Sequence, residues 1–199
     1  LSDLTYRVRP ADPHAHSFHV DIEIPNPDVE LVELSLPAWI PGSYMIRDFA
    51  RNILTFVAES ADGMRLDCRK RDKQTWICRT TGDPIRVRYQ VYAWELSVRA
   101  SHFDTSHAYF NGPGLLMRVH GMDHRACLLD LLPPAGSVEG DWEVATSLVP
   151  ERIDEHGFGL YRAEDYEDLI DHPVEMGCFD GSLVLLASEP SHSRSPPPS

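Results

Sequence analysis

The chain has 199 residues, of which 42% are hydrophobic and 25% charged, a composition that predicts a soluble globular protein with its own core. Its 18 basic and 31 acidic residues give a formal charge of −13, which disfavours nucleic acid as a partner because a phosphate backbone would be repelled. No apolar run approaches the roughly 18 to 20 residues that cross a bilayer, and the N-terminus lacks the regions of a signal peptide. We therefore expect no membrane span, and the compartment, cytoplasmic or periplasmic, stays open.

Two segments near the N-terminus predict β-strands. In Ser17–Pro25, apolar and polar residues alternate with the two-residue period of a half-buried strand. A second strand is expected in Val29–Pro37, after the turn cluster Pro25–Asp28. Turn clusters of this kind join antiparallel strands, so we predict that these two strands pair.

More β-rich segments follow along the chain, separated by turn signals at the short intervals typical of a sandwich or barrel. They cover residues 52–60, 75–80, 85–94, 115–120, 125–133, 143–148 and 181–188. One short helix is expected near Asp165–Ile170, where acidic residues open a run that Pro173 ends. The predicted fold is an all-β, antiparallel β-sandwich in residues 1–187, followed by a disordered tail or linker in residues 188–199, which are rich in Ser and Pro.

The basic residues and the cysteines favour structural interpretations. The densest basic cluster, Arg65–Lys73, is interleaved with acidic residues and predicts the solvated face of a hairpin. The four cysteines show no C-x-x-C pair, and buried thiols are the simpler interpretation. A bridge between Cys68 and Cys78 stays open, since the two flank a short turn region.

The histidines are the candidates for a metal site. On an extended strand His14 and His16 would share a face, with His19 nearby in sequence, and His102 and His107 form a second group. No third ligand or general base stands at diagnostic spacing, so we interpret them as loop histidines. There is no H-E-x-x-H helix and no G-x-S-x-G elbow in the sequence. The residues by themselves therefore predict neither a catalytic nor a metal site.

Four longer motifs resemble one family in order and spacing: "LPAWIPGSYMIRDFARN", "KRDKQTW", "YQVYAWELSVRASHFDTSHAYFNG" and "DYEDLIDHPVEMG". The chain resembles the N-terminal domain of the glycyl-aminopeptidase family of zinc metallopeptidases, whose members carry a catalytic domain and then a PDZ domain. The resemblance spans about Tyr6 to Ser188. It implies a β-sandwich placed like the β-domain that precedes the thermolysin-like domain in aminopeptidase N relatives.

In that family the zinc ligands and the strand that meets the substrate amine lie downstream of this domain. None of these motifs is present in the 199 residues, so the chain is expected to be truncated relative to the family. The resemblance thus implies no catalytic residue and no cofactor in this chain, and zinc in a catalytic domain. Peptidase activity of the chain alone is not expected.

The first of the four motifs fits a sharp corner of the backbone. Its prolines remove backbone donors, its glycine can take a positive φ, its tryptophan offers an apolar anchor, and its charged residues can satisfy groups left open by an irregular loop. We favour a structural role over direct substrate contact for Trp39, Pro41, Gly42, Tyr44, Arg47 and Asp48.

Three residues are expected to contact a substrate by analogy with the related aminopeptidase architecture. Tyr109 and Asn111 lie in a hairpin-like loop, where a phenol or amide oxygen would accept from the ammonium group of a peptide. The alternative for Asn111 is a side chain that caps its own loop. Glu175 is expected near the hinge to the catalytic domain, facing the cleft or pairing with a local Arg.

We consider three functions for the chain. The first is a non-catalytic domain that covers and supports the active-site cleft of a zinc aminopeptidase, with that catalytic domain or a peptide as its partner. The second is a free-standing peptide- or protein-binding β-sandwich, which could add a strand at a sheet edge. The third, a small metalloenzyme, would require the histidines to converge on one metal ion.

Overall fold

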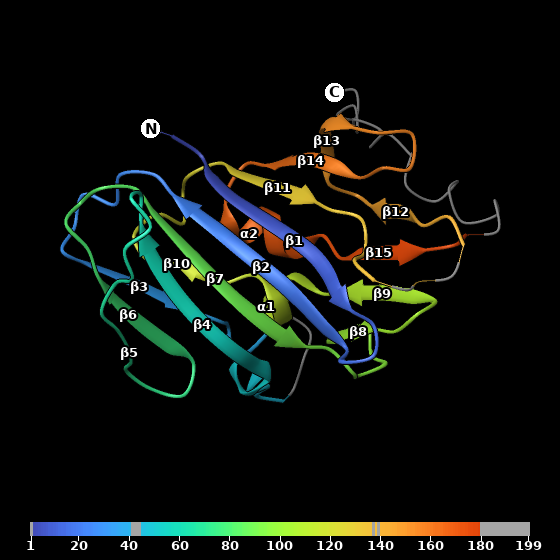
Figure 1. Cartoon of the computed structure of the whole chain (residues 1–199), viewed down its shortest axis with the longest axis horizontal. Coiled ribbons are helices and arrows are strands. Elements are labelled where there is room, and N and C mark those ends of the chain that lie inside the picture. Colours follow the sequence, from blue (N-terminus) through green and yellow to red (C-terminus); the bar gives the residue numbers. More distant parts are fainter. Residues whose placement is uncertain (1, 41–44, 137, 139, 180–199) are drawn as a thin grey trace, which may run out of the picture.

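The computed structural model of the chain describes residues 2–40, 45–136, 138 and 140–179. Within these residues the fold consists of three β-sheets, two short α-helices and a 3-10 helix (Figure 1). The all-β prediction is confirmed. The predicted boundary at residue 187 and the predicted strand in residues 181–188 lie outside the described residues.

The largest sheet has seven strands, and their neighbours are antiparallel except for the parallel pair β1 and β11. In spatial order the strands are β13 (Val149–Ile153), β14 (Gly159–Ala163), β11 (Cys127–Leu131), β1 (Leu4–Asp12), β2 (Ser17–Ile24), β7 (Ile85–Tyr92) and β4 (Ile53–Ser60). In Figure 1 the long strands of this sheet run diagonally across the front of the molecule.

Two four-stranded sheets and the helices complete the described fold. The second sheet has the order β10 (Arg118–Val119), β3 (Leu31–Ser35), β6 (Thr75–Arg79) and β5 (Cys68–Lys70). The third has the order β12 (Glu143–Thr146), β15 (Val174–Gly177), β9 (His107–Phe110) and β8 (Ser101–Phe103). The helices are η1 (Phe49–Asn52), α1 (Gly112–Leu115) and α2 (Tyr166–Asp171), and none of the described helices has the length and apolar character to span a bilayer.

The predicted pairing of the first two strands is wrong. β2 pairs with β1 and β7 in the large sheet, whereas β3 pairs with β6 and β10 in the second sheet. The reason lies in the connection, where Asn26 and Asp28 both adopt positive φ. These conformations redirect the chain instead of closing a hairpin, and β3 begins a different layer.

Two further predictions about local structure have different outcomes. The strand expected in residues 115–120 is mostly not a strand, because α1 extends to Leu115 and pairing covers only Arg118–Val119. The helix expected near residues 165–170 is present as α2. Its N-cap is Asp165, whose carboxylate accepts from the Asp168 N–H at 2.9 Å, as an acidic helix start predicts.

Three buried tyrosines join the inner face of the fold to the segment that leaves α1. The hydroxyls of Tyr6, Tyr89 and Tyr166 donate to the carbonyls of three consecutive residues, Met117, Leu115 and Leu116, at 2.8, 2.8 and 2.9 Å. All six residues are at most 2% exposed. We call this arrangement the tyrosine clamp. It satisfies backbone groups that would otherwise be buried without partners.

The hairpin of β5 and β6 carries the basic cluster and a disulfide. Cys68 and Cys78 are register partners, and they form a disulfide bond. This answers the question that the sequence left open. Arg65, Arg69 and Lys73 are exposed, as the prediction of a solvated hairpin face required.

Candidate functional site

Tyr109 and Glu175, two of the residues expected to contact a substrate, lie opposite each other in the third sheet. They are register partners in the antiparallel pairing of β9 with β15, and such partners point to the same face of a sheet. Both line a pocket of about 290 Å³, which we call the histidine pocket. Its other lining residues are Leu96, Ser97, Val98, His102 and His107.

The third expected contact, Asn111, is coupled to Tyr109 through one backbone oxygen. The Tyr109 hydroxyl and the Asn111 side-chain amide both donate to the Val98 carbonyl, at 2.8 and 2.9 Å. Burial and then the charge of Glu175 raise the pKa of Tyr109, so the phenol is protonated at neutral pH. Because these donors bind the protein, the oxygens of Tyr109 and Asn111 are the atoms that can accept from a ligand.

Each of the two histidines that line the histidine pocket lies within hydrogen-bond distance of a carboxylate. His107 Nε2 lies 2.9 Å from Glu175 Oε1, and His102 Nε2 lies 3.2 Å from Asp104 Oδ2. Burial disfavours the charge of Asp104, but hydrogen bonds from Ser106, His102 and the His107 N–H outweigh it and lower the pKa of this carboxyl to about 2. Asp104 therefore carries a negative charge over the whole physiological range and orients His102.

His102 is also part of a stack of rings. The ring centroids of His16 and Trp94 are 3.7 Å apart, those of Trp94 and His102 are 4.8 Å apart, and His107 follows at 5.8 Å. Within the described residues, the buried Nδ1 of His102 has no hydrogen-bond partner. The stacking of His16, Trp94 and His102 restricts the orientation of the His102 ring, which lines the pocket.

Asn111 lines a second, neighbouring pocket rather than the histidine pocket. This cavity of about 410 Å³ is bounded by Ile40, Asn111, Pro113 and the acidic side of α2, which contributes Glu167, Asp168, Ile170 and Asp171. Val98 links the two pockets, since it lines the first and accepts from Asn111. Three of the four motifs therefore contribute residues to this second pocket: the first through Ile40, the third through Asn111 and the fourth through Asp168.

Of the residues for which a structural role is expected in the first motif, the structure describes Trp39, Arg47 and Asp48. Arg47 Nη1 lies 3.4 Å from Glu95 Oε1 and Asp48 Oδ2 lies 3.9 Å from Lys73 Nζ, so both charges are used in contacts with other loops. Trp39 is 55% exposed, whereas Leu36 and Ile40 of the same motif are buried. The predicted residues Pro41, Gly42 and Tyr44 lie outside the described residues.

His16 and His19, two of the histidines considered as metal ligands, make other contacts. His14 lies in the turn between β1 and β2, and His16 Nδ1 lies 2.8 Å from the Phe103 carbonyl oxygen. His19 Nε2 lies 2.8 Å from the Gln90 side-chain nitrogen. Across the described part of the chain, no group of three or more His, Cys, Asp or Glu side chains is arranged to hold a metal ion.

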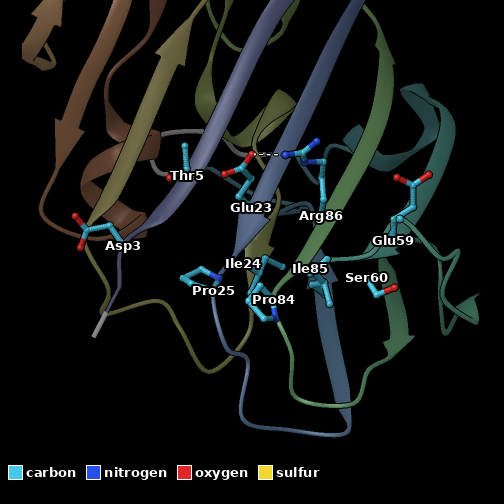
Figure 2. A pocket seen from close by; sticks show the side chains of 12 residues that line it. Asp3, Thr5, Glu23, Ile24, Pro25, Glu59, Ser60, Pro84, Ile85 and Arg86 are labelled. Carbon is cyan, nitrogen blue, oxygen red and sulfur yellow. Dashed lines mark hydrogen bonds and ion pairs between the residues drawn. The ribbon is translucent and has the colours of Figure 1, made fainter.

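A larger cavity of about 450 Å³ lies at the end of the seven-stranded sheet (Figure 2). Its charged side chains are paired: Arg86 with Glu23 at 2.7 Å, Asp3 with Arg162 at 3.0 Å, and Glu59 with Arg88. A charged ligand there would have to compete with existing ion pairs. We therefore place the candidate site at the histidine pocket instead.

The sequence analysis did not single out the lining residues Leu96, Ser97 and Val98. Leu96 and Val98 are 80% and 73% exposed, and they form the apolar wall of the histidine pocket. The signal in the sequence is weak, because single apolar residues in a loop are common on protein surfaces. Their position next to Tyr109 depends on the folded chain.

Comparisons with known proteins agree with the resemblance in the motifs. The sequence model of the Peptidase M61 N-terminal domain matches residues 5–178. The chain is similar to the solved structure of an aminopeptidase N family protein from Idiomarina loihiensis, with 38% identity and a TM-score of 0.82 over 87% of this chain and 29% of that one. It therefore spans less than a third of that protein.

A more distant similarity is to an M1 zinc metallopeptidase from Deinococcus radiodurans, with 12% identity and a TM-score of 0.47. That match covers 89% of this chain and 42% of the other protein. No curated protein matches the chain.

Proposed function

The chain belongs to the peptidase M61 N-terminal domain family, and from this premise we propose that it covers and supports the active-site cleft of a peptidase catalytic domain. The proposed partner is that catalytic domain, and the proposed ligand is the free amino end of a peptide. Zinc would reside in the catalytic domain, where it would activate the water that attacks the peptide bond. The residues of this chain would bind and orient the substrate.

One observation carries this proposal. Acceptor groups from two of the family motifs lie close together: the carboxylate of Glu175 and the phenol oxygen of Tyr109 line the histidine pocket, and Asn111, bonded to the same Val98 carbonyl as Tyr109, lines the neighbouring one. A peptide ammonium group has three donors, so a carboxylate with two neutral oxygens matches its hydrogen-bonding needs. The apolar wall of Leu96 and Val98 would face the adjoining side chain of the peptide.

Glu175 is the strongest of these acceptors because it is charged. Its carboxylate lies 2.9 Å from His107 Nε2 and is still 42% exposed, so one oxygen can bind a ligand while the other keeps its imidazole partner. Tyr109 and Asn111 would add weaker, neutral contacts. In this scheme Arg47 and Asp48 act only through the loops that they hold.

The test uses the protein encoded by the complete open reading frame that contains these residues. We expect zinc and the hydrolysis of glycyl and alanyl reporter substrates in that protein. Glu175→Gln should raise KM about tenfold and change kcat less, because a charge-assisted contact to the amino group is lost while its shape is kept. Glu155→Gln, at a side chain that is 88% exposed in the turn between β13 and β14 and does not line the histidine pocket, is the matched control.

Two results would count against the proposal. If the full-length protein neither binds zinc nor cleaves these substrates, the assignment to a peptidase is wrong. If activity is present but Glu175→Gln behaves like Glu155→Gln, the substrate lies elsewhere and the domain has only a supporting role.

A further inference from the structure

We propose that His107 is a positioning residue for Glu175, and that a proton taken up by His107 weakens the binding of a ligand's ammonium group to the histidine pocket as the pH falls. This inference rests on the proposed function, which assigns the amino end of a peptide to the Glu175 carboxylate. It concerns how that site responds to pH.

His107 is the partner of Glu175 in the described structure. Its Nε2 lies 2.9 Å from Glu175 Oε1, and no other ion pair or hydrogen bond reaches this carboxylate within the described residues. The arginine partner that the sequence left open is therefore not found among these residues. A carboxylate has no hydrogen to donate, so His107 Nε2 donates in this contact and holds one oxygen of Glu175 in place.

The contact between these two side chains is diagonal across the strands. In the pairing of β9 with β15, the register partner of His107 is Gly177 and not Glu175. A Cβ at Gly177 would lie 3.3 Å from the Ser106 carbonyl oxygen and 3.9 Å from the His107 ring. Because Gly177 has no side chain, the imidazole can lean along β15 toward Glu175, a diagonal reach that long side chains can make.

The titratable groups around His107 come from its own strand and from the elements packed against it. Within the described residues they are Glu175 on β15, His102 on β8 with its ring centroid 5.8 Å away, Asp104 in the turn before β9, which accepts from the His107 N–H, and Tyr109 on β9. The loop of residues 94–100, between β7 and β8, lines the same pocket only with the uncharged side chains named above.

These groups differ in whether they change charge between pH 5 and pH 8. Burial disfavours the charge of Asp104, but hydrogen bonds lower its pKa to about 2, and burial raises the pKa of Tyr109, so neither changes charge there. Imidazole is the side chain that ordinarily titrates in this range. His102 Nε2 lies 3.2 Å from Asp104 Oδ2, so a proton on His102 mainly offsets the charge of Asp104. A proton on His107 offsets the charge of Glu175.

The direction of the effect follows from this pairing. Beside a neutral His107, Glu175 presents its full negative charge to a ligand's ammonium group. Beside a protonated His107, the pair has no net charge, and two cations compete for one carboxylate. The His107 side chain is 31% exposed, so it can exchange protons with water. Ligand affinity should therefore fall as the pH is lowered and His107 becomes charged.

The test uses the 199-residue chain and alaninamide, a small amine whose ammonium group is its only charge. Its dissociation constant is measured at pH 7.0 and pH 5.5 by NMR titration of the backbone amides of β9 and β15. An α-amino group loses its proton only near pH 8, so the probe is mostly charged at both pH values. We expect binding to be about fivefold weaker at pH 5.5, the size of effect typical of one exposed ion pair.

Variants of one histidine assign this effect. His107→Gln keeps an N–H donor but does not titrate, so its affinity should be the same at pH 5.5 and pH 7.0. His107→Ala loses the donor and should bind more weakly than His107→Gln at both pH values, since the carboxylate is no longer held. His14→Gln, the same change at an exposed histidine in the turn between β1 and β2, is the matched control and should keep the pH dependence.

Three results would overturn the proposal: equal affinity of the unaltered chain at both pH values, a pH dependence that His107→Gln retains, or no binding of alaninamide at either pH. None of them depends on zinc or catalysis. If Glu175→Gln leaves KM unchanged in the full-length protein while the chain binds alaninamide as expected, the proposed substrate contact is wrong and the pH-dependent amine site stands.

Discussion

The tyrosine clamp and the loop of residues 94–100 both contain a hydrogen bond from a tyrosine hydroxyl to a backbone carbonyl, but the two bonds lie in different surroundings. In the clamp, Tyr89 donates to the Leu115 carbonyl at 2.8 Å; at the candidate site, Tyr109 donates to the Val98 carbonyl at 2.8 Å. Leu115 is fully buried, whereas Val98 is largely exposed. Equal distances therefore do not imply equal energies, because the cost of an unmade bond depends on whether water can replace it. The clamp stabilises the fold, and the second bond positions a surface.

Tyr89→Phe is the variant expected to have the largest effect on stability. The hydroxyl donates to the Leu115 carbonyl and accepts from the Met117 N–H at 3.1 Å, so its removal leaves two buried backbone groups unpaired. We expect the free energy of unfolding to fall by about 2–4 kcal/mol in urea titrations. Tyr92→Phe, on an exposed residue of the same strand, is the control and should change it by less than about 0.5 kcal/mol. Similar losses in both would remove the distinction between the two regions.

Asp104→Asn tests the acidic anchor of the histidine pocket and is expected to have an intermediate effect. The pKa of this carboxyl is lowered from 3.8 to about 2 in the folded chain, so ionisation stabilises the fold above pH 3.8, and this stability is lost as the pH falls toward 2. We expect a loss of about 1–2 kcal/mol at pH 7, allowing for the partial exposure of the group, and almost none near pH 2.

The measurement for Asp104 is the free energy of unfolding of both proteins across this pH range. The clamp should not contribute to the change, because burial raises the pKa of Tyr6, Tyr89 and Tyr166 and keeps the phenols protonated. A difference that stays constant from pH 7 to pH 2 would show that hydrogen bonding to Asp104 does not depend on its charge.

Tyr109→Phe should have the smallest effect on stability and a clear effect on motion. Asn111 still donates to the Val98 carbonyl, and water can replace the lost hydroxyl, so the free energy of unfolding should fall by less than about 1 kcal/mol. Hydrogen exchange at the Ala100 amide, which is bonded within the loop, should become faster. Unchanged exchange would mean that Tyr109 does not hold the loop.

The strands with strong patterns were predictable because their signal is local. β2 and β7 alternate buried and more exposed residues, and the alternation is visible in the sequence before any partner strand is known. The acidic start of α2 is equally local. β1 was missed although it is central to the large sheet, and β13, β14 and the short strands β8, β9 and β15 were also missed. Strands of three or four residues carry too few side chains for a period to be recognised.

The candidate site was predictable in part. Tyr109, Asn111 and Glu175 were singled out through the motifs that resemble the aminopeptidase family, but no pattern indicated that Tyr109 and Glu175 are register partners. The roles of Leu96 and Val98 were not predicted. Val98 accepts from Tyr109 of β9 and from Asn111, and Leu96 lines the same pocket as Tyr109. A loop sequence does not show which strands lie beneath it.

The sequence by itself determined the fold class, the family and the short list of residues for the site, because these depend on composition, local period and motif order. Only the tertiary structure decided that β3 leaves the sheet of β2, that three tyrosines secure residues 115–117, and that Val98 joins two pockets. Each of these depends on contacts between residues far apart in the chain, such as Tyr6 with Met117, and on burial. Such contacts form when sheets pack, and packing is a property of the whole chain.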